Sequence, residues 1–289
     1  MNTLKTILLT GAAGTVGRFL RDELRERYTF RLSDINSVEP LYDNETFIEA
    51  DLTDLDAITK ASEGVDGIIH LGGYPVEGSW EQILDANIIG CRNLYEAARL
   101  TDAKRVVFAS SNHTMGFYRR DQTIDDNMTA RPDSRYGVSK VFGEAMGALY
   151  ADKYGLGVMA IRIGFVYIRP IDVRRLSIWI SPRDLAQLVS IGLEHPDLGY
   201  RVVYGMSDNA RAWWDNSSAL RLGYKPQDRA EDYAEGGSAD AIRRHRGSAR
   251  RRAPGRRFRV FRRRGRCAAD GNDLIHAPYI LDPSPGRAP

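Results

Sequence analysis

One stretch near the N-terminus decides the fold: Thr6-Ile7-Leu8-Leu9-Thr10-Gly11-Ala12-Ala13-Gly14-Thr15-Val16-Gly17. It begins as an apolar run typical of a buried strand, and a helix-like segment, 18–27, follows its last glycine. Gly11 permits a tight turn, Gly14 lets backbone approach a pyrophosphate, and Gly17 lets the helix pack close to the sheet. A pyrophosphate would lie at the helix N-terminus, where free N–H groups and the helix dipole favour anions. The candidate contacts are Gly11, Ala13, Gly14, Thr15, Val16 and Gly17; the alternative is an ordinary glycine-rich turn.

Strand-like and helix-like segments alternate along the rest of the chain. Strands are expected at 6–9, 30–32, 47–50, 67–71, 105–110, 158–163 and 201–204, and helices at 18–27, 54–62, 80–99, 136–154 and 182–194. This alternation predicts an α/β fold with a parallel, doubly wound Rossmann sheet, whose ligand lies at the carboxyl ends of the strands. We expect one domain over residues 1–235, with a small C-terminal substrate-binding part at 164–233.

Length and composition narrow the class of protein. The 289 residues suit one large domain, and 43% hydrophobic residues can fill its core. No apolar run reaches the ~18 residues of a membrane span, and the N-terminus does not read as a signal peptide. The two cysteines, Cys91 and Cys267, make neither a disulfide framework nor a metal site. A cytoplasmic protein that binds no metal and no membrane is expected.

The basic residues are concentrated near the C-terminus. Residues 243–266 contain 13 arginines and no acidic residue, and residues 267–289 carry a net charge of −2. Of the formal net charge of +3, this leaves −8 for residues 1–242. We expect residues 236–289 to be a disordered or aberrant tail rich in Arg, Pro and Gly. One hypothesis is a shifted reading frame of GC-rich DNA; the other is a basic arm that binds RNA or an anionic surface.

Three strand ends supply further candidates for a dinucleotide site. Asp34, 17 residues after Gly17, can accept hydrogen bonds from ribose hydroxyls and repel a 2′-phosphate, which favours NAD over NADP. Its alternative is a turn aspartate. Asp51 and Leu52 could flank the adenine. The run Leu71-Gly72-Gly73 suits close approach of backbone to the nicotinamide-side ribose.

Tyr136 and Lys140 lie one helical turn apart and so share a helix face. An ammonium beside a phenol favours the phenolate, which helps a tyrosine to accept a proton at neutral pH. The pair alone is a weak signal, but Ser111, at the end of the fifth strand, can donate a hydrogen bond to a reacting oxygen. Asn87, on the apolar side of a helix, is either a satisfied core residue or part of the site. His113 is either a ligand contact or a loop histidine.

These residues together resemble the extended short-chain dehydrogenase/reductase superfamily. Within it, several longer stretches are similar to bacterial uronate dehydrogenases over about residues 4–233. The stretches are Leu71-Gly72-Gly73, Ala86-Asn87-Ile88-Ile89-Gly90, Phe108-Ala109-Ser110-Ser111-Asn112-His113, Arg131-Pro132-Asp133, Tyr136-Gly137-Val138-Ser139-Lys140, Arg162-Ile163-Gly164 and Trp213-Trp214-Asp215-Asn216.

The resemblance implies oxidation of galacturonate or glucuronate at C1, with NAD as cofactor, to the lactone of the aldaric acid. It implies Tyr136 as the proton acceptor, with Lys140 lowering its pKa and holding the nicotinamide ribose. Ser111, Asn112 and His113 would contact the sugar, and Arg174 the carboxylate, for which a guanidinium is chemically suited. The alternative for Arg174 is a surface-loop arginine. A homo-oligomer is also expected.

Two positions depart from the pattern of these enzymes, because Pro75 and Phe165 stand where they usually carry serine. Both would contact substrate or nicotinamide, and Phe165 could narrow the sugar pocket. Two other functions stay open. One is a nucleotide-sugar epimerase or dehydratase, against which the short C-terminal part argues. The other is a catalytically weak NAD-binding or RNA-binding protein, supported by the two departures and the basic tail.

Overall fold

The computed structural model describes residues 5–234. Its core is a parallel sheet of seven strands in the order β3-β2-β1-β4-β5-β6-β9, the order of a doubly wound Rossmann sheet, as the sequence predicts. The strands are β1 (Lys5–Thr10), β2 (Tyr28–Asp34), β3 (Glu45–Glu49), β4 (Gly67–His70), β5 (Arg105–Ser111), β6 (Gly157–Ile163) and β9 (Tyr200–Gly205). The order changes direction between β1 and β4, where such folds bind ligands.

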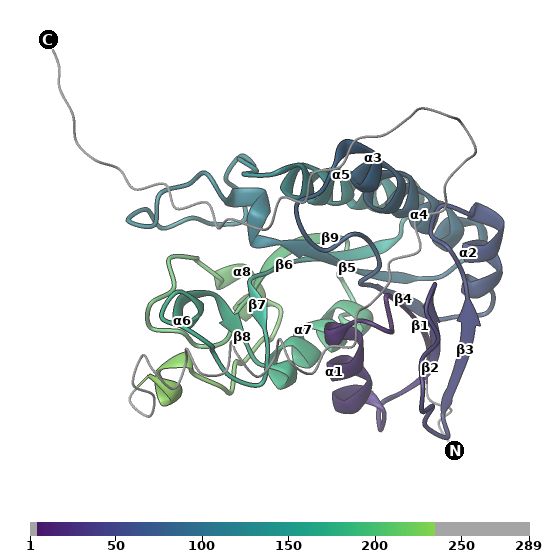
Figure 1. The fold of residues 1–289 in the computed structure, drawn as a ribbon, viewed down its shortest axis with the longest axis horizontal. Coiled ribbons are helices and arrows are strands. Elements are labelled where there is room, and N and C mark those ends of the chain that lie inside the picture. Colours follow the sequence, from purple (N-terminus) through teal and green to yellow (C-terminus); the bar gives the residue numbers. More distant parts are fainter. Residues whose placement is uncertain (1–4, 235–289) are drawn as a thin grey trace, which may run out of the picture.

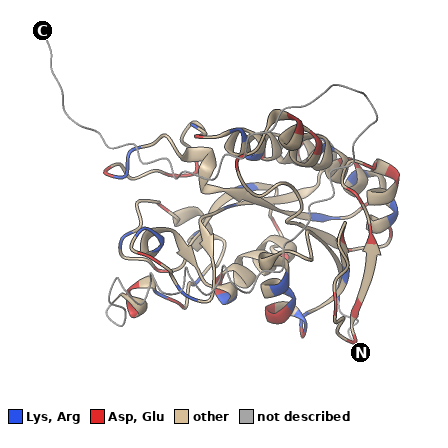
Figure 2. Cartoon of the chain, viewed as in Figure 1, with Lys and Arg blue, Asp and Glu red and all other residues tan. Residues whose placement is uncertain are grey.

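Helices cover both faces of this sheet (Figure 1). On one face lie α1 (Thr15–Leu24) and α7 (Pro182–Glu194), and on the other lie α2 (Leu55–Ser62), α4 (Gly90–Leu100) and α5 (Arg135–Tyr154). Each layer closes its own apolar core, and the strand residues alternate between the two cores. Charged residues lie mostly on the helices and loops, while the strands in the middle of the sheet carry few (Figure 2).

A small lobe lies beside the carboxyl ends of β6 and β9 (Figure 1). It contains the two-stranded sheet of β7 (Phe165–Val166) and β8 (Trp179–Ile180), with α6 (Arg175–Ile178), α8 (Ser217–Arg221) and the 3₁₀ turn η3 (Ala230–Tyr233). Its aromatic residues pack on one another; Trp213 and Trp214 stack with ring centroids 5.1 Å apart. The lobe falls within the segment 164–233 that the sequence assigns to the substrate side.

The long helix expected at 80–99 is interrupted. It runs as α3 (Trp80–Ile83), a π-helical segment η1 (Leu84–Ile89) and α4. Hydrophobic periodicity does not reveal this, because a π-turn adds one residue without removing the apolar face. None of the helices within residues 5–234 is long and apolar enough to cross a membrane. The expectations for the tail at 236–289 fall outside the described residues.

Candidate active site

The glycine stretch forms the turn between β1 and α1. Gly11 has φ +71°, and a Cβ there would lie 2.7 Å from the backbone nitrogen of Gly72, so glycine is required. Gly14 is the N-cap of α1 and, like other glycines, offers no side chain to bond the first N–H groups of the helix. The start of α1 therefore presents backbone donors and the positive end of a helix dipole, which fits a pyrophosphate.

Asp34 lies at the carboxyl end of β2, directly beside this turn. Its Oδ2 accepts a hydrogen bond from the Ala13 amide at 3.1 Å, and its Oδ1 accepts one from the Asn36 amide at 3.0 Å. The Asn36 side-chain amide also donates to Oδ1, at 3.2 Å. A carboxylate has about four acceptor positions, so about one, on Oδ2, is left for a ribose hydroxyl. The turn role considered from sequence and the ligand role are thus compatible in one residue.

The segment after β3 is held in place by hydrogen bonds from α4. Leu52 is half-buried and Asp51 exposed. The side-chain amide of Asn93, on α4, donates to the carbonyls of Leu52 at 2.9 Å and Thr53 at 3.0 Å. Asn93 could not be predicted from the sequence, because a polar residue on a buried helix face gives no sign of its partner.

The end of β4 is fixed by a buried histidine. His70 is 1% exposed, and its Nδ1 lies 2.8 Å from the Thr10 hydroxyl, which also accepts from the Gly72 amide at 3.3 Å. Burial, and secondarily the charge of Lys140, lower the pKa of His70 to about 3. A neutral imidazole therefore holds Leu71-Gly72-Gly73 against the glycine turn.

Asn87 lies in the π-helical segment η1, and its side chain is fully engaged. Its Oδ1 accepts from the Tyr74 amide at 2.6 Å, and its Nδ2 donates to the Tyr74 carbonyl at 3.0 Å and to Ser139 Oγ at 3.0 Å. Both amide hydrogens are thus used within the protein. Of the two alternatives left by the sequence, the geometry supports a satisfied residue that ties the loop after β4 to α5.

Tyr136 lies in the first turn of α5. Ser134 caps that helix by accepting from the Gly137 amide at 2.9 Å, and the Tyr136 amide donates to Glu77 at 3.2 Å. A Cβ on Gly137 would lie 2.5 Å from the carbonyl oxygen of His113, so the helix start approaches the loop after β5 closely. The Tyr136 hydroxyl makes no hydrogen bond to any residue in 5–234 and is free for a ligand.

Lys140 follows one turn later and is only 7% exposed. Its Nζ lies 5.5 Å from the centroid of the Tyr136 ring and 5.0 Å from that of Phe108. Within residues 5–234 it has no carboxylate partner. A buried ammonium without a hydrogen-bond acceptor is costly, so the site fits a group such as a ribose that brings hydroxyl oxygens to Lys140.

One turn further along α5, Glu144 forms a buried network that could not be predicted from the sequence. It makes a two-point ion pair with Arg162 of β6, with both distances 2.9 Å, and accepts from Ser110 Oγ at 2.5 Å. Burial alone would lower the pKa of Arg162, but the hydrogen bonds and charge of Glu144 raise it. In the sequence, Glu144 is marked only by its spacing, because it follows Lys140 by four residues as Lys140 follows Tyr136.

Ser110 and Ser111 are engaged differently at the end of β5. Ser110 donates to Glu144, whereas Ser111 Oγ donates to Asn112 Oδ1 at 3.3 Å and accepts from the amide of His113 at 3.2 Å in the 3₁₀ turn η2 (Asn112–Met115). The His113 Nδ1 lies 2.8 Å from Asp133 Oδ1, and its ring meets the Tyr136 ring edge-on at 5.7 Å. Asp133 therefore orients His113 beside Tyr136, a role that the sequence did not reveal.

A cavity of about 70 Å³ opens beside η2. Asn112, His113 and Arg174, three of the residues predicted to bind substrate, line it together, although Arg174 comes from the far lobe. The others are Met115, Gly116, Tyr118, Arg120, Asp133, Ile178, Trp213 and Trp214. Partial burial and the neighbouring charges of Arg175 and Arg120 lower the pKa of Arg174.

Pro75 and Phe165 do not line this cavity. Pro75 is exposed in the loop after β4. Phe165 pairs with Trp179 through the small sheet, and its ring lies 6.1 Å from that of Tyr167 and 5.3 Å from the Arg175 guanidinium. The bulk of Phe165 is thus directed largely into the packing of the lobe.

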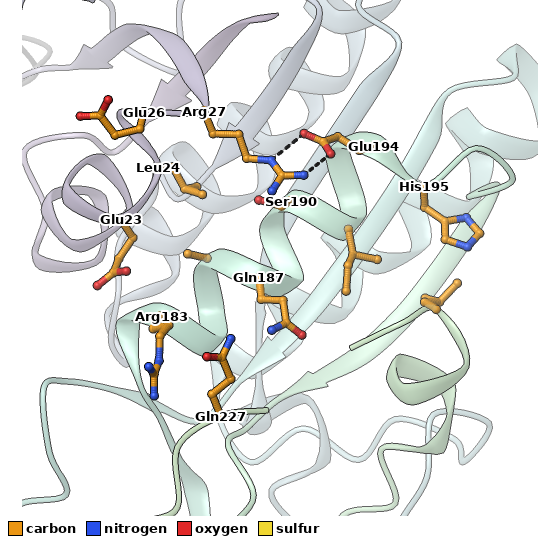
Figure 3. A pocket seen from close by; sticks show the side chains of 13 residues that line it. Glu23, Leu24, Glu26, Arg27, Arg183, Gln187, Ser190, Glu194, His195 and Gln227 are labelled. Atoms are coloured by element: carbon orange, nitrogen blue, oxygen red, sulfur yellow. Dashed lines mark hydrogen bonds and ion pairs between the residues drawn. The ribbon is translucent and has the colours of Figure 1, made fainter. Parts of the chain in front are cut away.

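A larger hollow of about 830 Å³ lies between α1, α7 and the segment 222–227 (Figure 3). It contains none of the predicted site residues. Figure 3 shows Arg27 and Glu194 paired with each other across it, and Tyr28 also donates to Glu194 at 2.6 Å. Arg27 and Glu194 thus pair with each other in this hollow, and the residues predicted to bind substrate line the smaller cavity instead.

Comparison with known proteins gives the family. The model of the NAD dependent epimerase/dehydratase family matches residues 7–171, more than half of the chain. The chain belongs to this family. The matched segment includes the glycine turn, Ser111, Tyr136 and Lys140. Arg174 and the tryptophans of the small lobe lie beyond it.

Individual relatives extend beyond that segment. A uronate dehydrogenase of Pseudomonas syringae pv. tomato is 48% identical over 227 residues, which make up 78% of this chain and 82% of that protein. The crystal structure of uronate dehydrogenase from Agrobacterium tumefaciens is 43% identical with a TM-score of 0.77, over 87% of this chain and 91% of that one. A variant of that enzyme complexed with NAD has the same identity and TM-score, over 85% and 90%.

Proposed function

We propose that this chain is a uronate dehydrogenase that oxidises galacturonate or glucuronate at C1 with NAD. The observation that carries the proposal is the cavity at which Asn112, His113 and Arg174 meet, next to the helix of Tyr136. It brings Arg174, a cation suited to a carboxylate, close to Tyr136, a group that can take a proton. Relatives named uronate dehydrogenase at 44–48% identity support the same reaction.

The cofactor half of the site fits NAD. The uncapped start of α1 would bind the pyrophosphate, Asp34 the adenosine ribose, and Lys140 the nicotinamide ribose. Asp51 and Leu52 would flank the adenine, and Leu71-Gly72-Gly73 would face the nicotinamide side. NAD supplies, when bound, the acceptor for the hydride that leaves C1.

The protein's part of the reaction is to hold the sugar and take one proton. Arg174 would bind the carboxylate, and Asn112 and His113 would bind ring hydroxyls. The Tyr136 Oη would take the proton of the C1 hydroxyl, helped by the nearby Lys140 ammonium. Ser111 would donate a hydrogen bond to that oxygen as C1 becomes the lactone carbonyl. Asn87 would position the Tyr74 loop rather than touch substrate.

We infer further that residues 1–235 form the whole catalytic unit and act in the cytoplasm as a homo-oligomer. Exposed apolar residues on η1 and α5, among them Leu84, Ile89 and Leu149, support self-association. Sedimentation analysis of the full chain tests the oligomer. NADH formation by a chain that ends at Ala234 tests the catalytic unit.

The test of the function is NADH formation with galacturonate, glucuronate, glucose and a UDP-hexose. A uronate dehydrogenase forms NADH in step with consumption of either uronate and far less with glucose. An epimerase instead interconverts the UDP-hexose without net NADH. Turnover of the UDP-hexose, with no reaction of either uronate, would contradict the proposal.

A further inference from the structure

The cavity beside η2 contains two guanidinium groups. Arg174 reaches it from the loop before α6, and Arg120 reaches it from the loop that follows η2. Figure 2 shows basic residues gathered around α6 in the small lobe. Of the two, only Arg174 was expected from the sequence, because nothing in the sequence places Arg120, 54 positions earlier, at the same cavity.

Neither guanidinium has a carboxylate partner among residues 5–234. Their neighbours in sequence do: Arg119 pairs with Asp121 at 2.5 Å, and Arg175 pairs with Asp172. In each pair of adjacent arginines, one is paired with a carboxylate and the other lines the cavity. Because Arg120 and Arg174 repel each other, an anion between them would be stabilised by both.

A cation–π contact with Trp213 holds Arg120 toward the cavity. Its guanidinium lies 5.3 Å from the centroid of the Trp213 ring, which stacks in turn on Trp214. A cation over an indole face loses less entropy on binding a ligand than a free side chain does. Asp133, the acidic residue of the cavity, already accepts hydrogen bonds from His113 and Ser134 at its Oδ1.

The size of the cavity indicates which part of a ligand enters it. About 70 Å³ is well below the ~300 Å³ at which pockets for whole small-molecule ligands begin, so an end of the ligand enters it rather than the whole sugar. Between two guanidinium groups, the end that fits is the carboxylate. The ring would therefore lie outside, toward Tyr136.

We propose that Arg120 is a second carboxylate-binding residue, which together with Arg174 selects hexuronates over neutral sugars. This rests on the proposed oxidation of hexuronates and adds a specificity-determining residue to it. Two guanidinium groups that approach one carboxylate from different loops can bind both of its oxygens.

The test compares Arg120→Gln with its neighbour Arg119→Gln, which removes an exposed charge outside the cavity. For Arg120→Gln, the KM for galacturonate should rise about tenfold, the factor of one lost charge-assisted hydrogen bond, while kcat and the KM for NAD stay unchanged. Arg119→Gln should resemble wild type. Arg120→Lys should recover part of the affinity, because it restores the charge but not the paired N–H donors of a guanidinium.

A direct binding measurement excludes a purely kinetic effect. Calorimetric titration of galacturonate into the NAD-loaded Tyr136→Phe protein should give a Kd that Arg120→Gln raises by the same factor. Glucose turnover should not change, since it has no carboxylate. Equal KM values for Arg120→Gln and Arg119→Gln in an active enzyme would overturn this inference alone. Absence of uronate oxidation by wild type would overturn it together with the proposed function.

Discussion

His113 is the residue whose interpretation gains most from the structure. The sequence left it open as a ligand contact or a loop histidine. In the fold its Nδ1 meets Asp133, its ring meets Tyr136, and it lines the cavity. A histidine oriented by a carboxylate presents a fixed ring nitrogen to a ligand.

Asp133→Asn tests this orientation. The amide keeps the shape but loses the charge that fixes His113, so kcat/KM for galacturonate should fall about tenfold, with NAD binding unchanged. Steady-state kinetics measure this, with Asp121→Asn, in an exposed pair with Arg119, as the control. Equal losses in both variants would exclude a specific role for Asp133.

At the residue scale, the sequence supplies candidates whose chemistry is local. Asn112 and His113 follow a strand end, and Tyr136 and Lys140 share a helix face. Arg120, Asp133 and Glu144 could not be found, because each acts through a partner that only the tertiary fold brings near. The resemblance implied that Phe165 contacts substrate or nicotinamide, yet its ring packs within the lobe.

At the scale of elements, α5 organises the site. Its N-terminus carries Tyr136, its second turn Lys140, and its third turn Glu144, which locks it to β5 and β6. Periodicity predicted this helix and the alternation around it. It could not predict β7 and β8, because two-residue strands leave no pattern.

Glu144→Gln should be strongly destabilising, because it leaves the Arg162 charge buried without compensation. We expect a loss of about 3–5 kcal/mol in the free energy of unfolding. The double variant Glu144→Gln/Arg162→Met should recover part of this. Urea denaturation measures both, and Arg119→Gln, in an exposed ion pair, should cost at most about 1 kcal/mol. A loss that small for Glu144→Gln would show that the buried pair is not structural.

Two asparagines on the η1–α4 segment test whether the site divides into a substrate side, near Asn87, and a cofactor side, near Asn93. Asn87→Ala frees the Tyr74 backbone, and Asn93→Ala frees the carbonyls of Leu52 and Thr53. Each should cost about 1–3 kcal/mol of stability. Asn87→Ala should raise the KM for uronate and Asn93→Ala the KM for NAD. Identical kinetic effects of the two variants would contradict that division.

At the scale of the whole molecule, pH should act through His70. Its pKa is about 3 in the folded protein and about 6.5 when exposed. Between these values the unfolded chain binds a proton that the folded chain does not, so stability is lost as pH falls from 6.5. The slope from this residue approaches about 1.4 kcal/mol per pH unit.

Urea denaturation of wild type and His70→Gln between pH 7 and pH 5 measures this contribution. The variant should be less stable at pH 7, because it disturbs the bond to Thr10, but its stability should fall less steeply with acid. Parallel pH profiles would mean that His70 does not titrate as its burial indicates.

The sequence predicted the doubly wound sheet because most strands of the core, β1 and β4 to β6 above all, carry a buried apolar run. The relation between the sheet and the small lobe could not be predicted, since it depends on aromatic packing among residues far apart in the chain. Arg174 reaches Asn112 and His113 only through that packing. Candidates for the cofactor half of the site can therefore be chosen from strand ends and a helix face, whereas only the fold brings Arg174 to Asn112 and His113.

The most direct test of the account is turnover of galacturonate by Tyr136→Phe. The variant keeps the ring beside His113 and Lys140 but lacks the oxygen that takes the C1 proton. We predict that kcat falls by about 10²–10⁴-fold, the range for loss of a general base, while calorimetry shows NAD bound as by wild type. Near-normal turnover by this variant would contradict the assignment of Tyr136, and with it the mechanism.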